Sequence, residues 1–396
     1  MCGVFRPCLP WPMPDREAAS PLPFLPYGRQ EIGDADVKAV VEALVSGWLT
    51  TGPRVGEFEQ AFALHCGAAE GVAVNSGTAA LHAAMRAIGV RTGDEVIVPA
   101  LTFAASANAA IYEGATPVFA DVEEDTLLID PASVKRRISP RTKAIVAVDY
   151  AGQPADYDAL RHLARSRGIR LIADACHAPG AVYNDRKVGT LGDVSCFSFH
   201  PVKHMTTCEG GMCTTDDPEM AAHMRRFRNH GIDSDHRSRE AKGAYAYDMA
   251  ELGYNYRLPD VQCALGLSQL PRLDGWVLAR QKIARFYDRA FARMPQVAPL
   301  YTHPGRSNAY HLYVVRLAAS LDRDRVFTAL RAEGIGANVH YAPVYMHSYY
   351  RARGYAAGLC PVAERASKQI LTLPMFPAMT ENDVNRVVDV LTTVTA

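Results

Sequence analysis

The feature of this sequence that most constrains its fold is a series of short apolar segments between residues 71 and 215, several of them separated by segments with helical periodicity. A strand that is apolar along its whole length is buried on both faces. Alternation of such strands with helices is typical of a largely parallel sheet that helices cover on both sides. The predicted strands are Gly71–Val74, Glu95–Pro99, Thr116–Ala120, Lys143–Val148, Arg170–Ala173, Val194–Phe199 and Gly211–Thr215, and the helices between them include Thr78–Ile88, Ala104–Glu113 and Asp158–Arg167.

The segments on either side of this α/β region are also regular. Helices are predicted at 34–46 and 55–66, each followed by a glycine. After Pro259 the pattern changes to longer helices and isolated strands, which indicates a smaller α+β unit. We expect a flexible N-terminal tail over 1–23, a large domain over 24–272 and a small C-terminal domain over 273–396. The elements predicted after Pro259 are helices Val261–Leu270, Leu273–Met294, Asp322–Glu333, Cys360–Ile370 and Glu381–Val394, and strands Tyr310–Leu317 and Ala337–Tyr341.

Charge and cysteine content exclude several classes of partner. The 396 residues contain 42 Lys and Arg against 42 Asp and Glu, so the chain has no global attraction for a nucleic-acid backbone, and any anionic ligand needs a local site. The nine cysteines form no disulfide or zinc framework, so we expect a reducing cytoplasm and no metal. No apolar run approaches the ~20 residues of a membrane span, and no membrane association is expected.

Polar residues follow several of the predicted strands, at the edge where open α/β sheets bind ligands. Asn75-Ser76-Gly77-Thr78 ends one strand and begins a helix, and free backbone amides at such a turn hold phosphates. Asp174 directly follows another strand, and a buried carboxylate there needs a cation or a proton. A structural interpretation stays open for both motifs, because Ser, Thr and Asp also cap helices.

Lys203 follows a third strand, in the segment Ser198–Lys203. Desolvation of a lysine lowers its pKa and exposes a nucleophilic amine, although an exposed surface lysine is the common alternative. The order of the motifs favours catalysis, since Ser198 and Lys203 follow Asp174 by 24 and 29 residues and the phosphate-type turn comes before all three. A lysine that forms an imine, an acid that keeps a ring nitrogen protonated and helix-start donors for a phosphate are what pyridoxal phosphate requires, and we predict this cofactor.

At these positions the chain resembles the sugar aminotransferases of the DegT/DnrJ/EryC1/StrS family, which are fold-type I pyridoxal phosphate enzymes with a mostly parallel sheet flanked by helices and a smaller C-terminal α+β domain. The resemblance covers about residues 24–390. Three segments, Pro26–Gln30, Ser198–Thr207 and Asn338–Tyr341, are most similar to the UDP-4-amino-4,6-dideoxy-N-acetyl-β-L-altrosamine transaminases of pseudaminic acid biosynthesis. The motifs that carry the family resemblance are Trp48–Pro53, Asn75–Leu81, Gly93–Ile97, Asp174–His177, Ser198–Lys203, Glu209–Gly211 and Gly253–Arg257.

The resemblance implies a role for each matching residue. Lys203 would form the imine and move the proton, Asp174 would pair with the pyridinium, and His177 would contact the side of the ring that bears the hydroxyl. The remaining cofactor contacts would be phosphate binding by Gly77, Thr78 and Ser198, ring stacking by Phe103, and a phosphate contact by Asn255 from a partner subunit. The last contact implies a homodimer whose active site is shared across the interface.

Substrate contacts are expected from Thr51, Arg228, His340 and Tyr341, and a structural role is an equal alternative for His340 and Tyr341. Arg225, Arg226, Arg228 and His230 would hold a diphosphate, unless they form a solvated helix face. Two positions depart from the family pattern. Cys208 stands where glycine is usual, and Asn184-Asp185-Arg186 replaces a turn that more often contains glycine.

The implied reaction is a ping-pong transamination from an amino acid, by resemblance L-glutamate, to a nucleotide-linked 4-keto-6-deoxy sugar, by resemblance UDP-linked. Relatives that dehydrate sugars carry His in place of Lys203, so the lysine favours transamination. Three alternatives stay open. These are a GDP- or dTDP-linked 3- or 4-ketosugar as acceptor, a catalytically silent fold-type I regulator or scaffold, and a nicotinamide-linked sugar oxidoreductase, which the missing Gly-x-Gly-x-x-Gly motif disfavours.

Overall fold

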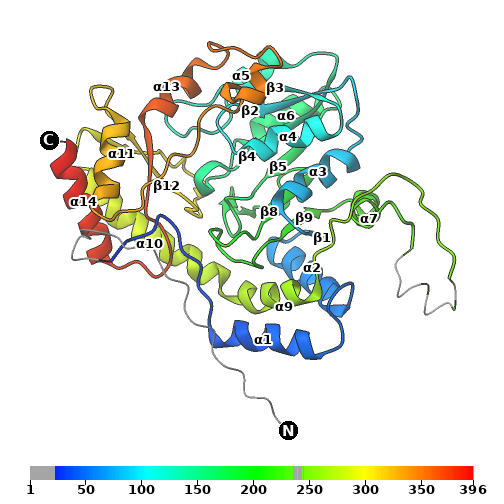
Figure 1. The fold of residues 1–396 in the computed structure, drawn as a ribbon. Helices are drawn as coiled ribbons and strands as arrows, with labels where there is room; N and C mark the ends of the chain where they lie inside the picture. The colour runs from blue at the N-terminus through cyan, green and yellow to red at the C-terminus, as the bar shows by residue number, and fades with distance from the viewer. Residues whose placement is uncertain (1–22, 235–238, 240–242, 244, 396) are drawn as a thin grey trace, which may run out of the picture.

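The computed structural model describes residues 23–234, 239, 243 and 245–395, so the predicted tail lies, except for its last residue, outside the described residues. A sheet of seven strands forms the centre, in the order β1-β9-β8-β5-β4-β2-β3 (Figure 1). The strands from β8 to β3 are parallel, and β9 runs antiparallel to both β8 and β1. All seven predicted strands are confirmed, as β1 Glu70–Val74, β2 Glu95–Pro99, β3 Thr116–Ala120, β4 Thr142–Val148, β5 Arg170–Asp174, β8 Val194–Ser198 and β9 Gly211–Thr215.

Two apolar cores lie on the two faces of this sheet, because successive side chains of a strand point to opposite faces. Val72 and Val96 belong to one core, and Ala73 and Ile97 belong to the other. The first core is closed by α3 (Gly77–Ala87), α4 (Ala104–Tyr112) and α7 (Pro218–Phe227), and the second by α2 (Pro53–Cys66), α5 (Pro131–Arg137), α6 (Tyr157–Arg165) and α9 (Asp260–Gln269). The predicted α/β architecture is confirmed.

Helix α1 (Asp34–Val45) lies along α9 at the edge of the molecule (Figure 1). Its Asp36 is fully buried and accepts hydrogen bonds from Ser268, Gln269 and Arg272, which follow one another around the end of α9. This carboxylate anchors one face of α1 and leaves the opposite face of the helix exposed.

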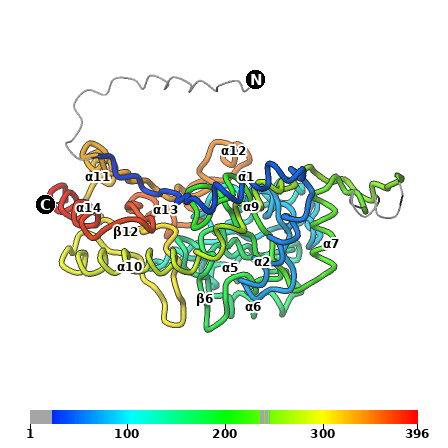
Figure 2. The backbone as a smooth tube through the Cα atoms, turned by 90° about the horizontal axis from the view of Figure 1, so that it is seen from below, coloured from blue at the N-terminus to red at the C-terminus, as the bar shows by residue number. Residues whose placement is uncertain are grey.

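The C-terminal part has a small core of its own. Helices α10 (Leu273–Phe291), α11 (Arg323–Ala332) and α14 (Glu381–Thr395) gather at one end of the molecule beside an antiparallel sheet (Figure 2). Leu273 and Trp276 at the start of α10 pack in the core of the central sheet, while Ile283 and Tyr287 further along pack in the small core. Because α10 enters both cores, the domain boundary at residue 273 stays a prediction. The remaining elements are β10 Val297–Pro299, β12 Tyr313–Leu317, β13 Ile370–Leu373, α12 Ser348–Arg351, α13 Pro361–Gln369, and a second small sheet of β6 Val182–Tyr183, β7 Arg186–Lys187 and β11 Arg306–Ser307.

One predicted strand is wrong. The segment Ala337–Tyr341 forms a single bridge, from Asn338 to Thr372, instead of a strand. The side chain of Asn338 accepts a hydrogen bond from the amide of Val339, and the next residues leave the sheet edge and reach the cavity described below. A side chain that bonds its own backbone competes with ladder pairing, which limits the strand here.

Candidate active site

A cavity of about 310 Å³ lies at the ends of β1, β5 and β8. It is bordered by residues that are far apart in the sequence but follow neighbouring strands, as expected for the carboxyl edge of a parallel sheet. Nine of the twelve predicted site residues line it, namely Gly77, Thr78, Phe103, Asp174, His177, Ser198, Lys203, His340 and Tyr341.

Asp174 ends β5 and lies almost completely buried at the base of the cavity. Its Oδ2 accepts a hydrogen bond of 2.6 Å from Oγ of Ser106, which in turn lies 2.8 Å from Oγ1 of Thr102. Its Oδ1 lies 3.3 Å from the amide of Cys176. These donors satisfy a buried carboxylate that forms no ion pair with the side chains that the structure describes, so the acid has a fixed orientation and is available to a cationic ligand.

Lys203 lies in the turn that follows β8, where its amide donates to the carbonyl of His200 at 2.8 Å. Burial lowers the pKa of the Lys203 amine, and Cys176 and Asp174 oppose that shift. A less basic lysine is uncharged for a larger fraction of the time, and an uncharged amine is a nucleophile.

A tight turn at the start of α3 faces Ser198. Ser76 caps the helix by accepting from the amide of Ala79 at 3.1 Å. The amides of Gly77 and Thr78 have no acceptor within the part of the chain that the structure describes. A Cβ atom on Gly77 would lie 2.8 Å from Cβ of Ser198, so only glycine fits there. Free amides and the Ser198 hydroxyl form a cradle of the kind that binds phosphate.

Histidines and a tyrosine complete the wall of the cavity. Nε2 of His177 lies 3.4 Å from the hydroxyl of Tyr341, and its Nδ1 has no partner among the described residues. Burial lowers the pKa of His177 well below the usual value for histidine, so the ring is neutral. Burial also lowers the pKa of His340 to about 4, and Nδ1 of His340 lies 2.9 Å from Oγ1 of Thr372.

A second cavity of about 720 Å³ adjoins the first and shares Thr102, Phe103, His340 and Tyr341 with it. Its further walls come from α4 and from the segment 338–350, and they contain no Lys, Arg, Asp or Glu side chain. Phe103, Tyr112 and Tyr349 are all at least 46% exposed, which leaves aromatic faces open to a ligand.

Three predicted site residues do not line either cavity. Thr51 and Asn255 are exposed. Arg228 donates from Nη1 to Glu59 and to the carbonyl of Ala73. The neighbouring Arg225 and Arg226 likewise pair with glutamates, Glu70 and Glu251. These arginines therefore have structural partners within the chain, and His230 is exposed.

The two departures from the family pattern both fall where the backbone is left-handed. Cys208 has φ +67° in the loop after Lys203, and Asn184 and Asp185 have φ +45° and +62° in the hairpin between β6 and β7. Glycine adopts this conformation without strain, whereas other residues do so at a cost. At both positions the chain therefore places a side chain where glycine would adopt the backbone conformation without strain.

The residues in the first cavity fit the predicted cofactor. A fixed carboxylate, a buried amine of lowered pKa and a cradle of free amides border one space. These groups match a pyridine nitrogen, an aldehyde and a phosphate. No cluster of three or more His, Cys, Asp or Glu side chains suited to a metal ion occurs among residues 23–234, 239, 243 and 245–395. None of the helices in those ranges combines the length and hydropathy needed to cross a membrane.

Sequence reasoning missed three residues that matter to this geometry. Ser106 holds Asp174, Tyr27 lines the cavity from the N-terminal segment, and His311 contacts Lys203. Ser106 and Asp174 are 68 residues apart in the sequence, and Lys203 and His311 are 108 residues apart. Because of these separations, no local sequence pattern predicts either contact.

Comparisons with known proteins agree with this site. The chain matches the model of the DegT/DnrJ/EryC1/StrS aminotransferase family over residues 30–392. It is 42% identical over 372 residues to the spore coat polysaccharide biosynthesis protein SpsC of Bacillus subtilis (strain 168), covering 92% of this chain and 96% of that protein.

Solved structures show the same fold. The putative sugar aminotransferase Spr1654 from Streptococcus pneumoniae, in its PLP-form, superposes with a TM-score of 0.88 at 31% identity, covering 94% of this chain and 98% of that one. Helicobacter pylori PseC, an aminotransferase involved in the biosynthesis of pseudoaminic acid, gives a TM-score of 0.88 at 31% identity, with coverage of 94% and 99%. The resemblance of the sequence motifs is thereby confirmed, and the chain belongs to the DegT/DnrJ/EryC1/StrS aminotransferase family.

Proposed function

We propose that the protein is a pyridoxal phosphate-dependent aminotransferase that transfers an amino group from an amino acid, L-glutamate, to a UDP-linked 4-keto-6-deoxy sugar. The observation that carries this proposal is the convergence of Lys203, Asp174 and the amides of Gly77 and Thr78 on one cavity. Membership of an aminotransferase family and the likeness to SpsC and PseC, whose names refer to carbohydrate biosynthesis, support a sugar as the acceptor.

The protein's own groups account for cofactor binding. Asp174, fixed by Ser106, would hold the protonated ring nitrogen, and Gly77, Thr78 and Ser198 would hold the phosphate. Phe103 would stack on the ring, and the neutral His177 would donate or accept a hydrogen bond at the ring hydroxyl. When bound, the cofactor supplies an aldehyde that accepts the amino group and a ring that accepts an electron pair.

Lys203 would move the proton. Its amine would take a proton from the α-carbon of the amino acid and give it to the reacting carbon of the cofactor, which is general acid–base chemistry at close range. Water would then supply the carbonyl oxygen of the departing keto acid while the nitrogen stays with the cofactor, and the same steps in reverse would deliver that nitrogen to the ketone of the sugar with release of water. Two half-reactions that share one cavity give ping-pong kinetics.

The second cavity supports a nucleotide-linked acceptor. Its aromatic walls, which contain no Lys, Arg, Asp or Glu side chain, suit the base and ribose of a nucleotide. Its junction with the first cavity at Phe103 and Tyr341 leads toward Lys203. A cavity of about 720 Å³ lies within the usual size range of small-molecule sites. His340 and Tyr341, which border both cavities, would contact the sugar between them.

A homodimer completes the proposal. On α1, Val37, Val41 and Leu44 are each more than half exposed and recur at helical spacing, so they form one apolar face. Contiguous exposed apolar surface of this kind marks a protein interface. In the dimer the exposed Asn255 would reach the phosphate in the partner's cavity, and the exposed Thr51 would contact substrate, whereas Arg228 is already paired with Glu59 in its own chain. We place the reaction in the cytoplasm, in keeping with the free state of all described cysteines.

A panel of nucleotide-linked ketosugars tests the acceptor. The purified, cofactor-loaded chain is incubated with L-glutamate and each UDP-, GDP- or dTDP-linked 3- or 4-ketosugar, and mass spectrometry detects the amino sugar. Product with the UDP-linked 4-keto-6-deoxy sugar alone supports the proposal, and product with a GDP- or dTDP-linked sugar instead replaces it. Absence of 2-oxoglutarate and of any amino sugar would favour the silent regulator.

A further inference from the structure

The amino group of Lys203 has one polar neighbour to which the proposed function gives no role. Nζ of Lys203 lies 3.3 Å from Nε2 of His311. Within the described part of the chain, no other group hydrogen-bonds to Nζ and no carboxylate forms an ion pair with it. Both side chains border the first cavity, so the contact lies where the reaction would occur.

His311 is neutral. It is 5% exposed, and burial lowers its pKa well below the usual value, with further lowering from Lys203, His177, His204 and Arg280. A neutral imidazole offers one ring nitrogen as a hydrogen-bond acceptor. Nδ1 of His311 has no partner among the described residues, so no protein group opposes the tautomer in which Nδ1 carries the proton and Nε2 accepts.

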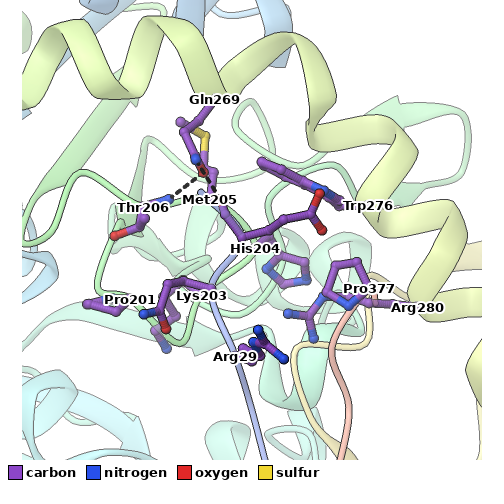
Figure 3. A pocket seen from close by; sticks show the side chains of 12 residues that line it. Arg29, Pro201, Lys203, His204, Met205, Thr206, Gln269, Trp276, Arg280 and Pro377 are labelled. Carbon is purple, nitrogen blue, oxygen red and sulfur yellow. Dashed lines mark hydrogen bonds between the residues drawn. The ribbon is translucent and has the colours of Figure 1, made fainter. Parts of the chain in front are cut away.

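The position of His311 is fixed from two sides. Arg280 is 1% exposed, and its Nη1 donates to the carbonyls of Tyr310, His311 and Met375 at 3.2, 3.4 and 2.9 Å. The ring of His311 lies 4.4 Å from the ring of His177 and 5.7 Å from that of His204, between centroids. Figure 3 shows Lys203, His204 and Arg280 among the residues that line a small separate cavity. The acceptor at Nε2 therefore has little freedom to move.

We propose that Nε2 of His311 positions the amino group of Lys203 while that group carries a proton between two carbon atoms, an inference that rests on the proposed function. Nζ takes the proton from the α-carbon of the amino acid and becomes an ammonium, and the electron pair left on that carbon passes into the cofactor ring. Nζ would then give the same proton to the cofactor carbon that is bonded to the amino nitrogen, where the electron pair returns from the ring to form the new C–H bond, and Nζ would again be a neutral amine. His311 accepts a hydrogen bond throughout and does not change its own protonation state.

The physical reason for such a partner is the flexibility of lysine. A lysine side chain that is not bonded to the cofactor loses much rotamer entropy when it is held in one geometry. A fixed acceptor supplies that geometry before the proton moves, which is how positioning lowers a barrier. Because His311 lies in the predicted C-terminal domain and Lys203 in the large one, the packing of the two parts would set the position of the amine.

Labelling of the lysine tests the contact directly. The full chain is loaded with pyridoxamine 5′-phosphate, the form in which Lys203 is free, and acetylation of Lys203 by acetic anhydride is followed against pH by peptide mass spectrometry. An acceptor stabilises the ammonium, so His311→Leu is expected to move the labelling midpoint to lower pH, and His311→Gln, which retains an acceptor, is expected to move it back. In turnover, His311→Leu is expected to lower kcat about tenfold with little change in the KM of the amino donor, and His311→Gln to recover most of the loss.

Clear outcomes overturn the inference. A folded His311→Leu chain with the labelling midpoint and kcat of the parent excludes the contact from the reaction. If His311→Leu does not fold, His311→Phe keeps a ring without a nitrogen and is judged by the same criterion. If the His311→Gln chain has the same labelling midpoint and kcat as the Leu or Phe variant, the acceptor atom has no role and His311 acts only through packing. Failure of the proposed function would give a different result, namely no turnover in the parent chain. The labelling of Lys203 needs no acceptor sugar, so it still tests the contact with His311 in that case.

Discussion

Oγ of Ser106 donates a hydrogen bond of 2.6 Å to Oδ2 of Asp174, and this contact joins α4 to the end of β5. The serine fixes the direction of a buried carboxylate that has no ion-pair partner among the described side chains. The orientation of the proposed pyridinium partner is therefore set by a residue that lies 68 positions away in the sequence.

Replacement of Ser106 by Ala is expected to weaken cofactor binding. Loss of one hydrogen bond to a charged group costs about 1.5–3 kcal/mol, which corresponds to roughly a tenfold to 150-fold rise in the Kd of pyridoxal phosphate. Fluorescence titration of the cofactor-free chain with pyridoxal phosphate measures this Kd. Ser133→Ala is the matched control, because Ser133 is a buried serine whose Oγ accepts from the amide of Asp121 in another part of the sheet. Equal Kd values for Ser106→Ala and the parent would contradict this account.

Lys203→Ala is expected to abolish turnover and covalent attachment of the cofactor. After treatment with borohydride, intact mass spectrometry should show the added mass of the reduced cofactor on the parent chain and on Lys38→Ala, a control at a side chain that is 78% exposed. The Lys203→Ala chain should show none. If that variant still traps the cofactor and aminates a ketosugar, another lysine carries the chemistry.

Asp149→Asn is expected to remove a pH dependence of stability. Burial raises the pKa of Asp149 to about 8 from its ordinary value of 3.8, so between these values the native state keeps a proton that the unfolded state loses. The contribution of Asp149 to the free energy of unfolding is therefore fully present below about pH 4. It decreases as the pH rises to about 8 and changes no further above that value. The amide keeps the acceptor for Ala155 and Tyr157 and never ionises.

The measurement is urea unfolding of both chains at several pH values. The free-energy difference between Asp149→Asn and the parent should shift in favour of the variant as the pH increases through this window. Because the buried histidines are common to both chains, they cancel in the difference. A free-energy difference that does not change with pH across this window would contradict a raised pKa of Asp149 in the native state.

Val41→Asp is expected to separate the proposed dimer into protomers. Val41 is 51% exposed at the centre of the apolar face of α1, and a carboxylate there would be buried without a partner in a dimer interface. Sedimentation velocity compares the parent, Val41→Asp and Leu278→Asp, the last being a control at a 64% exposed position on α10. A parent that sediments as a monomer, or a Val41→Asp chain that stays dimeric, rules out this face.

Cys208→Gly is expected to stabilise the loop that follows Lys203. Relief of the left-handed strain at φ +67° contributes about 1–2 kcal/mol. The added freedom of the unfolded chain costs about 0.4–1 kcal/mol, which leaves a net gain of about 0.8 kcal/mol at the middle of both ranges. Urea unfolding measures the gain, and Cys208→Ala, which keeps Cβ, should show none. A Gly variant that is no more stable than the Ala variant would argue against strain at this position.

The sequence alone determined the central sheet, because each strand there is buried on both faces and its apolar run marks it without reference to any distant residue. It also located Asp174, Ser198 and Lys203, since the carboxyl ends of neighbouring parallel strands meet at one edge and motifs that follow those strands must converge. It failed at Ala337–Tyr341, where a local pattern suggested a strand and a side-chain bond to the backbone limited the pairing to one bridge.

Only the tertiary structure decided what surrounds these residues. Ser106 reaches Asp174, and His311 reaches Lys203, through packing of segments 68 and 108 residues apart, and no periodicity encodes such a contact. The tertiary structure also showed that Arg228 pairs with Glu59, a contact that the basic cluster at 225–230 of the sequence does not reveal. Local propensity depends on neighbours in the chain, whereas the orientation of a carboxylate or an amine depends on neighbours in space, and for this reason the sequence supplied the chemical groups and the fold supplied their partners.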